Sequence, residues 1–312
     1  MADAVTISTE WRTIASGLRF PEGPVALDDG TILVVEIERG TLSRVHPDGT
    51  VEVVANCGDG PNGAAVGPDG AVWITNNGSC FQYIDVGGVL IPGGVPPGWT
   101  GGSIQKVNLQ TGAVETIYTE CDGRPLRAPN DLVFDAHGGF WFTDHGVRLE
   151  RSSDRTGVFY ATADGSTIRE VIFPLDAPNG VGLSPAGDQL YVAETHTGRV
   201  WSWDVPEPGV AVGGGLLAPH GDLLCGLPGH QLLDSLAVDG DGWVCVGTIV
   251  NGGITAISPD GSVVEHHPID DLLVTNICFG GPDGNTAFVT ASGSGRLLSA
   301  PWPRPGLALN YA

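Results

Sequence analysis

Six polar residues recur at one position of a repeated sequence pattern, and each carries a side-chain oxygen. These residues, which we call the anchors, are Glu22, Asn62, Asn130, Asn179, Asp234 and Asn276. Carboxylate and amide oxygens are the ligands that hard divalent cations such as Ca²⁺ and Mg²⁺ take in proteins. If the fold gathers the anchors, the two carboxylates would balance the charge of such an ion. The alternative is that each Asn or Asp only caps its own turn, a role that suits Glu22 poorly.

The sequence around each anchor is typical of a β-hairpin. A short apolar stretch follows the anchor, then a glycine eight residues after it, then a second stretch rich in Val, Ile, Trp and Phe. The glycine supplies the positive φ that a tight turn requires. The six glycines are Gly30, Gly70, Gly138, Gly187, Gly242 and Gly284. Further hairpin patterns follow most of these units, so one unit has about four strands.

Repeated four-stranded units of this length predict a β-propeller. We therefore expect an all-β fold, with residues 1–312 forming one six-bladed domain. The sixth unit has only three strands before the chain stops, and residues 4–16 offer a strand that could close this last blade and protect its edge. If the anchor strand is the innermost of each blade, all six anchors surround one mouth of the central channel. A β-sandwich is the alternative, but it gives no reason for a glycine at a fixed offset.

Composition excludes several classes of protein. The chain has 14 Lys and Arg against 36 Asp and Glu, a formal charge of −22, which disfavours binding to nucleic acid. Its 41% hydrophobic content is too high for a disordered chain, and no run is long enough for a membrane-spanning helix. The six cysteines have no metal-binding spacing and are expected to be buried thiols. With no secretory signal pattern at its start, we expect a cytoplasmic protein with no nucleic-acid or membrane partner.

The sequence resembles the regucalcin/gluconolactonase/luciferin-regenerating-enzyme family of six-bladed propellers. The segments that carry the resemblance are PEGPV at 21–25, PNDLVFDAHGGFWFTD at 129–144, PNGVGLSPAGDQLYVAET at 178–195, LDSLAVDGDGWVCVG at 233–247 and TNICFGGPDGNTAFVT at 275–290. The resemblance implies one divalent cation in the channel, with Ca²⁺ expected ahead of Zn²⁺, Mg²⁺ or Mn²⁺. It also implies hydrolysis of a small-molecule lactone, such as that of a sugar acid.

The resemblance also implies roles for individual residues. Glu22, Asn179 and Asp234 would bind the metal, and Asp234 would also be the catalytic base. Asn130 would contact the substrate or complete the metal shell, and Asp131 beside it is included in the expected substrate site. The sequence departs from the family at Ser235, where a glycine is usual, and at Ala128, where the family often has a substrate-binding arginine; here the arginine is Arg127.

Residues 77–102 form an insertion between two strands of the second unit. This segment is expected either to cover one face as a lid that carries Phe81, Tyr83 and Trp99, or to be a Gly/Pro-rich loop without function.

Other functions stay open at this level. The same scaffold and metal could support phosphotriester hydrolysis or a carbon–carbon lyase reaction, or the propeller could be a non-catalytic binding protein with a structural metal. His145 and His196 each follow the second strand of a unit, so either could reach the channel mouth as a base or be an ordinary turn histidine. No GxSxG pattern indicates a serine nucleophile.

Overall fold

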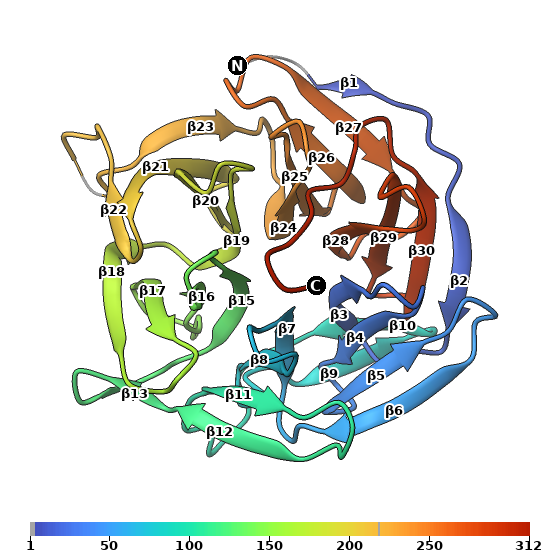
Figure 1. Cartoon of the computed structure of the whole chain (residues 1–312), viewed down its shortest axis with the longest axis horizontal. Coiled ribbons are helices and arrows are strands. Elements are labelled where there is room, and N and C mark those ends of the chain that lie inside the picture. Colours follow the sequence, from blue (N-terminus) through green and yellow to red (C-terminus); the bar gives the residue numbers. More distant parts are fainter. Residues whose placement is uncertain (1–3, 218) are drawn as a thin grey trace.

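The computed structural model of the chain describes residues 4–217 and 219–312, and this part of the chain forms strands without helices. Six blades, each with four antiparallel strands and two of them with one additional strand, surround a central channel, as Figure 1 shows, which confirms the predicted six-bladed propeller. Within the described residues there is accordingly no helix able to cross a membrane.

Each of the first three blades is built from four strands that follow one another from the channel outward in chain order, with an insertion between the second and third strands of blade two. Blade one contains β3 (Pro21–Ala26), β4 (Ile32–Glu36), β5 (Thr41–Val45) and β6 (Val51–Asn56). Blade two contains β7 (Pro61–Val66), β8 (Val72–Asn76), β11 (Ser103–Val107) and β12 (Val114–Tyr118). Blade three contains β15 (Pro129–Phe134), β16 (Gly139–Asp144), β17 (Thr156–Thr162) and β18 (Ile168–Leu175).

The last three blades follow the same plan with additions at their outer edges. Blade four contains β19 (Pro178–Leu183), β20 (Gln189–Glu194), β21 (Arg199–Glu207) and β22 (Val210–Val212), and β23 (Asp222–Gly226) also pairs with β21. Blade five contains β24 (Leu232–Val238), β25 (Val244–Ile249), β26 (Gly253–Ile257) and β27 (Val264–Pro268). Blade six contains β28 (Val274–Gly280), β29 (Thr286–Ala291), β30 (Arg296–Pro301) and, from the N-terminal region, β2 (Arg12–Ser16).

The N-terminal region closes the ring, as predicted, but it does so in two pieces. The strand β2 pairs antiparallel with β30 and completes blade six. A shorter strand, β1 (Val5–Thr6), instead lies parallel to β27 at the edge of blade five. Figure 1 shows this segment wrapping around the outside of the last two blades. The N-terminal residues therefore protect two sheet edges instead of one.

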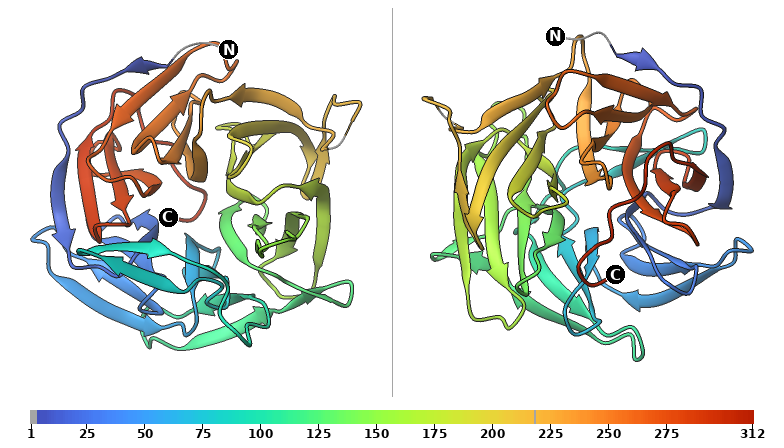
Figure 2. Two further views of the ribbon diagram at one scale, coloured as in Figure 1. Left: turned by 180° about the vertical axis from the view of Figure 1, so that it is seen from behind. Right: turned by 45° about the horizontal axis from the view of Figure 1, so that its top comes forward.

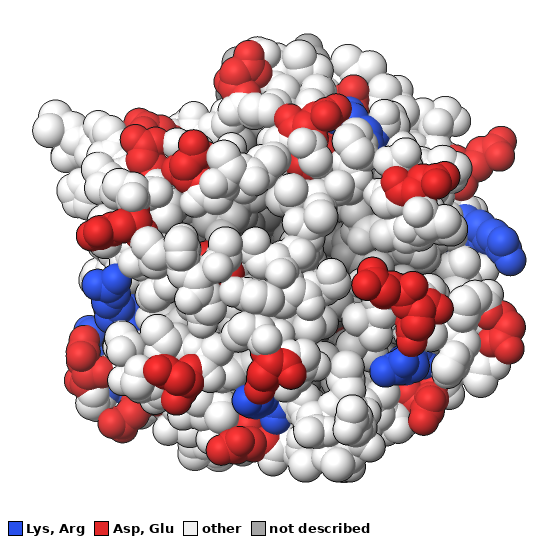
Figure 3. Space-filling view, viewed as in Figure 1, with Lys and Arg blue, Asp and Glu red and all other residues white. Residues whose placement is uncertain are grey.

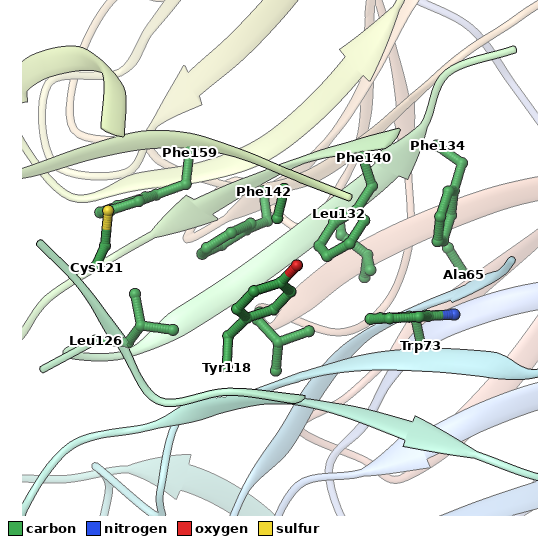
Figure 4. Packing of buried hydrophobic residues seen from close by; sticks show 12 residues of the cluster. Ala65, Trp73, Tyr118, Cys121, Leu126, Leu132, Phe134, Phe140, Phe142 and Phe159 are labelled. Atoms are coloured by element: carbon green, nitrogen blue, oxygen red, sulfur yellow. The ribbon is translucent and has the colours of Figure 1, made fainter. Parts of the chain in front are cut away.

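Large apolar side chains fill the spaces between neighbouring blades. Figure 4 shows the cluster between blades two and three, where Trp73 of β8 faces Phe134 and Phe140 across the interface. Trp73 and Phe140 are fully buried, and their rings lie 5.2 Å apart. Complete burial of a side chain of this size contributes roughly 1.5–3 kcal/mol to stability. This packing fixes the angle between blades, and hence the positions of the inner strands.

The six inner strands touch one another around the whole channel, from β3 through β7, β15, β19 and β24 to β28 and back to β3. Their close approach explains the glycines that follow some anchors. A Cβ on Gly23 would lie 2.7 Å from the backbone nitrogen of Ala64, and one on Gly180 would lie 2.5 Å from that of Leu236. The Glu-Gly and Asn-Gly steps of the sequence thus allow neighbouring backbones to meet at the anchor end of the channel.

The C-terminal residues 302–312, which we call the C-terminal strap, cross the opposite end of the channel (Figures 1 and 2). Arg304 forms ion pairs with the buried Asp239 (2.6 Å) and with Glu265 (2.8 Å), and it lies 4.0 Å from the Trp243 ring. Further along, Asn310 donates a hydrogen bond to the carbonyl of Phe134 (2.9 Å) on the far side of the channel. A cavity of about 290 Å³ lies between the strap and the inner strands.

Acidic side chains are spread over the face that carries the strap, with few Lys or Arg among them (Figure 3). All six cysteines are unpaired thiols, and all but Cys225 are buried.

Candidate functional site

The anchors lie at the beginning of the inner strands, at the end of the channel opposite the strap. In every blade the pairing between the first and second strand shifts register at the anchor, which is a β-bulge. Bulges redirect side chains and are frequent beside active sites. Glu22, Asn62, Asn130, Asn179 and Asn276 are each at most 5% exposed, whereas Asp234 is partly accessible.

Hydrogen bonds hold the side chains of three anchors in place. Asn276 donates from Nδ2 to Oε2 of Glu22 (2.7 Å), and this contact joins the last inner strand to the first. On the other side, Asn179 is held between two blades: its Nδ2 donates to the Thr195 hydroxyl (3.1 Å), and its Oδ1 accepts from the Ser235 hydroxyl (3.4 Å). The serine that replaces the usual glycine therefore orients Asn179, an anchor expected to bind the metal.

The turn-capping alternative is correct for some of the anchor oxygens. Glu22 accepts a hydrogen bond from the backbone N–H of Gly23 (2.6 Å), Asp234 from that of Ser235 (3.1 Å), and Asn276 from that of Ile277 (2.7 Å). In each case the bond uses one side-chain oxygen. For the carboxylates a second oxygen is left for other partners, so capping does not account for the whole set.

Two anchor oxygens are buried without any hydrogen-bond partner among the residues that the structure describes. They are Oε1 of Glu22 and Oδ1 of Asn130. Buried polar atoms in native proteins are nearly always hydrogen-bonded, and an exception needs a physical explanation such as a bound ion or water. Both atoms are acceptors, so a cation or a donor of the substrate would satisfy them.

Three acids share this part of the channel, and each has a raised pKa. Burial raises the pKa of Glu22 to about 7, although hydrogen bonds from Asn276 and Gly23 oppose the shift. Burial, followed by the nearby charge of Glu22, raises the pKa of Asp131 to about 8. The same two causes raise the pKa of Asp234 well above its usual value. Like charges held in a desolvated site favour binding of protons or of a cation.

Asp131 has a different environment from Asn130 beside it. Its Oδ1 accepts from the N–H of Leu132 (2.9 Å) and its Oδ2 from the N–H of Val181 (3.2 Å) on the neighbouring inner strand. The carboxylate therefore bridges β15 and β19 within the channel wall, and it also borders the cavity beneath the anchors. This geometry makes Asp131 a residue that holds Asn130 and Asn179 at a fixed separation.

The donor set fits a hard divalent cation better than a soft one. In the described part of the chain, no group of three or more His, Cys, Asp or Glu side chains is arranged to hold a metal ion. Any site here must therefore combine the carboxylates of Glu22 and Asp234 with amide oxygens of asparagines. Such an all-oxygen set suits Ca²⁺ or Mg²⁺. The buried, unpartnered oxygens of Glu22 and Asn130 agree with this assignment.

A second group of buried acids, which was not predicted from the sequence, positions the anchors. Glu36, Asp144 and Glu194 end the second strands of their blades. Each accepts a hydrogen bond from a backbone N–H just before an anchor: Arg19 (2.7 Å), Ala128 (2.7 Å) and Asp176 (2.8 Å), respectively. The signal was present in the sequence, because an acid ends the second apolar stretch of units one, three and four.

The insertion between β8 and β11 reaches other blades at the anchor end of the channel. It contains a hairpin of β9 (Tyr83–Val86) and β10 (Val89–Pro92). The N–H of Leu90 donates to the carbonyl of Gly293 in blade six (2.8 Å), and the Tyr83 ring lies 4.9 Å from that of Phe20, just before Glu22. Figure 2 shows this hairpin lying over blade one on the face opposite the strap.

Arg127 is held by neighbouring side chains. Its Nε donates to Asp154 (2.9 Å), and its guanidinium lies 4.5 Å from the ring of Trp99 in the insertion. His145 and His196 lie on the loops that leave β16 and β20, with their rings 5.8 Å apart. Burial lowers the pKa of both, to about 4 for His196, so both imidazoles are neutral at pH 7.

Comparison with known proteins shows the family of this chain. Residues 20–293 match the model of the SMP-30/gluconolactonase/LRE-like region. The chain belongs to this family. A gluconolactonase of Zymomonas mobilis is 27% identical over 92% of this chain and 80% of its own length. The lactonase drp35 of Staphylococcus saprophyticus is 28% identical over 86% of this chain and 74% of its own length.

Solved structures of family members share the fold. A gluconolactonase from Xanthomonas campestris superimposes with a TM-score of 0.74 at 21% identity, covering 95% of this chain and 90% of its own. A calcium-binding protein, regucalcin, from Agrobacterium tumefaciens gives a TM-score of 0.75 at 16% identity, covering 98% of this chain and all of its own. At these identities the likeness extends to the propeller itself, and the chemistry must be argued from the site.

Proposed function

We propose that this member of the SMP-30/gluconolactonase/LRE-like family is a divalent-metal-dependent hydrolase that opens the ring of a small lactone. The observation that carries the proposal is the buried Glu22 carboxylate. Its Oε1 has no hydrogen-bond partner among the described residues. Glu22 is also one of a ring of oxygen-bearing side chains that includes Asp234. The names of the relatives, gluconolactonase and lactonase, support the same reaction class.

Glu22, Asn179 and Asp234 would hold the cation, with Ca²⁺ expected first and Zn²⁺, Mg²⁺ or Mn²⁺ as alternatives. When bound, the cation supplies Lewis-acid polarisation of the lactone carbonyl. Hydrogen bonds orient two of these ligands in the metal-free protein. Asn276 and Gly23 donate to Glu22. Thr195 and Ser235 bond to the side chain of Asn179. Preorganised ligands of this kind bind without a large ordering cost.

Asp234 would act as the general base that accepts the proton of the attacking water. It is the one partly accessible anchor acid, so a water in the channel can reach it. Burial and the charge of Glu22 raise the pKa of Asp234, whereas a neighbouring positive charge favours the carboxylate. A bound cation is therefore expected to favour the ionised form of the base.

Asn130 would contact the substrate, because its unpartnered Oδ1 is available to a hydroxyl of the lactone or to the cation. Asp131 would contribute to this subsite by holding β15 against β19. We assign no part in proton transfer to His145 or His196. The unpaired cysteines suit a reducing compartment, and we propose that the reaction takes place in the cytoplasm.

The test is a lactone panel assayed with protein that has been stripped by a chelator. Hydrolysis is followed with a pH indicator while Ca²⁺, Mg²⁺, Mn²⁺ and Zn²⁺ are added back singly. The proposal predicts hydrolysis that depends on the added ion. If no ion restores hydrolysis of any lactone although an ion raises the melting temperature, the metal site stands and the lactonase activity does not. The panel then extends to phosphotriesters.

A further inference from the structure

Two histidines that the proposed reaction does not use lie together at the anchor end of the channel. His145 follows β16 of blade three and His196 follows β20 of blade four, and their rings lie 5.8 Å apart. Both of these strands end opposite the residue that precedes the anchor of their blade. The backbone N–H of His145 also donates to the carbonyl of Ala128 (2.9 Å), two residues before Asn130. The pair therefore joins the loops of two neighbouring blades.

Hydrogen bonding leaves one nitrogen of the His145 ring with a free lone pair. Its Nδ1 lies 3.0 Å from the carbonyl oxygen of Gly146. A carbonyl oxygen only accepts, so Nδ1 carries the proton of the neutral ring and Nε2 presents the lone pair. Histidines that bind metals commonly donate their other ring N–H to a backbone carbonyl in this way. His145 and His196 are both partly accessible, and neither is among the described residues that bury an unpartnered nitrogen away from solvent.

The charges around the pair do not oppose a cation. Burial lowers the pKa of both imidazoles, so their ring nitrogens are not occupied by an extra proton at neutral pH. A neutral imidazole is the form that binds a metal ion. Arg148 and Asp176 are the charged side chains that act on both rings, and they form an ion pair with each other (2.9 Å). Their opposite charges largely compensate at the site.

The spacing of the two rings matches that of imidazoles on a shared metal ion. An imidazole nitrogen lies about 2.0–2.1 Å from Zn²⁺, so two rings on one tetrahedral ion have their centroids roughly 5–6 Å apart. The 5.8 Å between His145 and His196 falls in this range. In the described residues no third His, Cys, Asp or Glu is arranged with them to hold a metal, so water would complete the shell. Imidazole nitrogens suit Zn²⁺, Cu²⁺ and Ni²⁺, whereas the all-oxygen anchor set suits Ca²⁺.

We propose that His145 and His196 together bind a transition-metal ion such as Zn²⁺, Cu²⁺ or Ni²⁺ at a second site, made of side chains other than the anchors. The ion would connect the loops of blades three and four next to the anchor ring. The inference does not depend on the lactonase activity. It predicts that the protein distinguishes two classes of metal, with a hard cation at the anchors and an imidazole-binding ion at the histidine pair.

The experiment titrates Zn²⁺ into protein that has been stripped by a chelator and then saturated with Ca²⁺, using calorimetry. Wild type is compared with two single variants, His145→Gln and His196→Gln, so that the test survives if one of them does not fold. His230→Gln is the matched control, because His230 is an exposed histidine outside the pair. Circular dichroism verifies the fold of each variant. Electron paramagnetic resonance of the Cu²⁺-loaded protein counts the nitrogen ligands.

The proposal predicts that Ca²⁺-saturated wild type binds one Zn²⁺ and that each variant of the pair weakens this binding by about 10-fold or more. His230→Gln should match wild type, and Ca²⁺ affinity should be the same in all four proteins. Cu²⁺ should show two nitrogen ligands in wild type and one in each variant of the pair. Absence of Zn²⁺ binding, or Zn²⁺ binding that is unchanged in both His145→Gln and His196→Gln, would overturn the second site. Neither result would bear on lactone hydrolysis, which this experiment does not measure.

Discussion

Glu22 and Asn276 lie 254 positions apart in the chain, and their side chains are joined by a 2.7 Å hydrogen bond where the first inner strand meets the last. The bond links closure of the propeller to the geometry of the proposed metal site. It uses Oε2 of Glu22, whereas Oε1 is buried and has no hydrogen-bond partner among the described residues. Ring closure therefore fixes one carboxylate oxygen and leaves the other for a bound cation.

Glu22→Gln should raise the stability of the metal-free protein and weaken cation binding. The amide keeps the size of the carboxylate and removes a buried charge, so we expect the metal-free variant at pH 8 to be more stable than wild type by about 1 kcal/mol. Cation affinity should fall by about 100-fold or more, because one of two carboxylates is lost. Thermal melting in chelator and calorimetric cation titration measure the two effects. Glu38→Gln, in an exposed pair with Arg19, is the control and should leave cation affinity unchanged.

The metal-free protein should lose stability as the pH rises. The folded pKa of Glu22, about 7, lies above its ordinary value of 4.5, so the folded state retains a proton that the unfolded state has released. Between these two values stability falls with pH, and the shift of Glu22 alone corresponds to about 3 kcal/mol. The pKa of Asp131 is raised to about 8, so stability should continue to fall up to that pH. Urea denaturation in chelator from pH 5 to pH 8.5 measures the slope, and an unchanged midpoint would contradict it. Saturating Ca²⁺ should restore stability at the upper end.

Asn130→Ala should affect catalysis more than folding. The variant removes an amide oxygen that has no partner among the described residues, so no hydrogen bond within the protein is broken at that atom. We expect kcat/KM to fall by about 10- to 100-fold, with a change in stability of less than about 1 kcal/mol. Asn62→Ala is a matched control on a neighbouring inner strand, at the same 5% exposure, and should have a smaller kinetic effect. Equal losses in the two variants would contradict a special role for Asn130.

The C-terminal strap should contribute to stability and not to catalysis. Arg304→Ala leaves Asp239 buried without its ionic partner and removes the guanidinium from the face of Trp243. Removing one partner of a buried ion pair costs about 3–5 kcal/mol. The double variant Asp239→Asn with Arg304→Met should recover part of that loss, because no uncompensated charge remains. Urea denaturation measures both. A change in kcat/KM beyond about twofold while the protein is folded would place the strap in the active site.

The repeat made the architecture predictable, because the anchor and the glycine eight residues later mark the same hairpin in every blade. All six of these glycines have positive φ, between 68° and 85°, as such turns require. The oxygen-bearing side chains were therefore assigned to one end of the channel from spacing alone. The β-bulges at the anchors could not be predicted, since they arise from the close packing of six inner strands, which no single unit encodes.

Contacts between distant segments could also not be predicted from the sequence. Tyr83 could be recognised as part of an insertion, but its proximity to Phe20 depends on how the hairpin folds over blade one. The ion pairs of Arg304 with Asp239 and Glu265 could not be predicted, because they form only when the C-terminal strap folds back across the end of the channel. The N-terminal residues were predicted to form one strand, and their division between two blades depends on the exposed edges of β27 and β30.

The most direct test of the account is a single comparison of wild type with Asp234→Asn, both stripped of metal, on the best lactone of the panel. We expect Ca²⁺ or another divalent ion to restore hydrolysis to wild type, with a loss of about 10³-fold or more in kcat for Asp234→Asn, because the amide cannot accept the proton of the attacking water. Both proteins should have the same fold by circular dichroism. Hydrolysis by wild type that is indifferent to the ion, or full activity in Asp234→Asn, would contradict the proposed metal-assisted, Asp234-dependent mechanism.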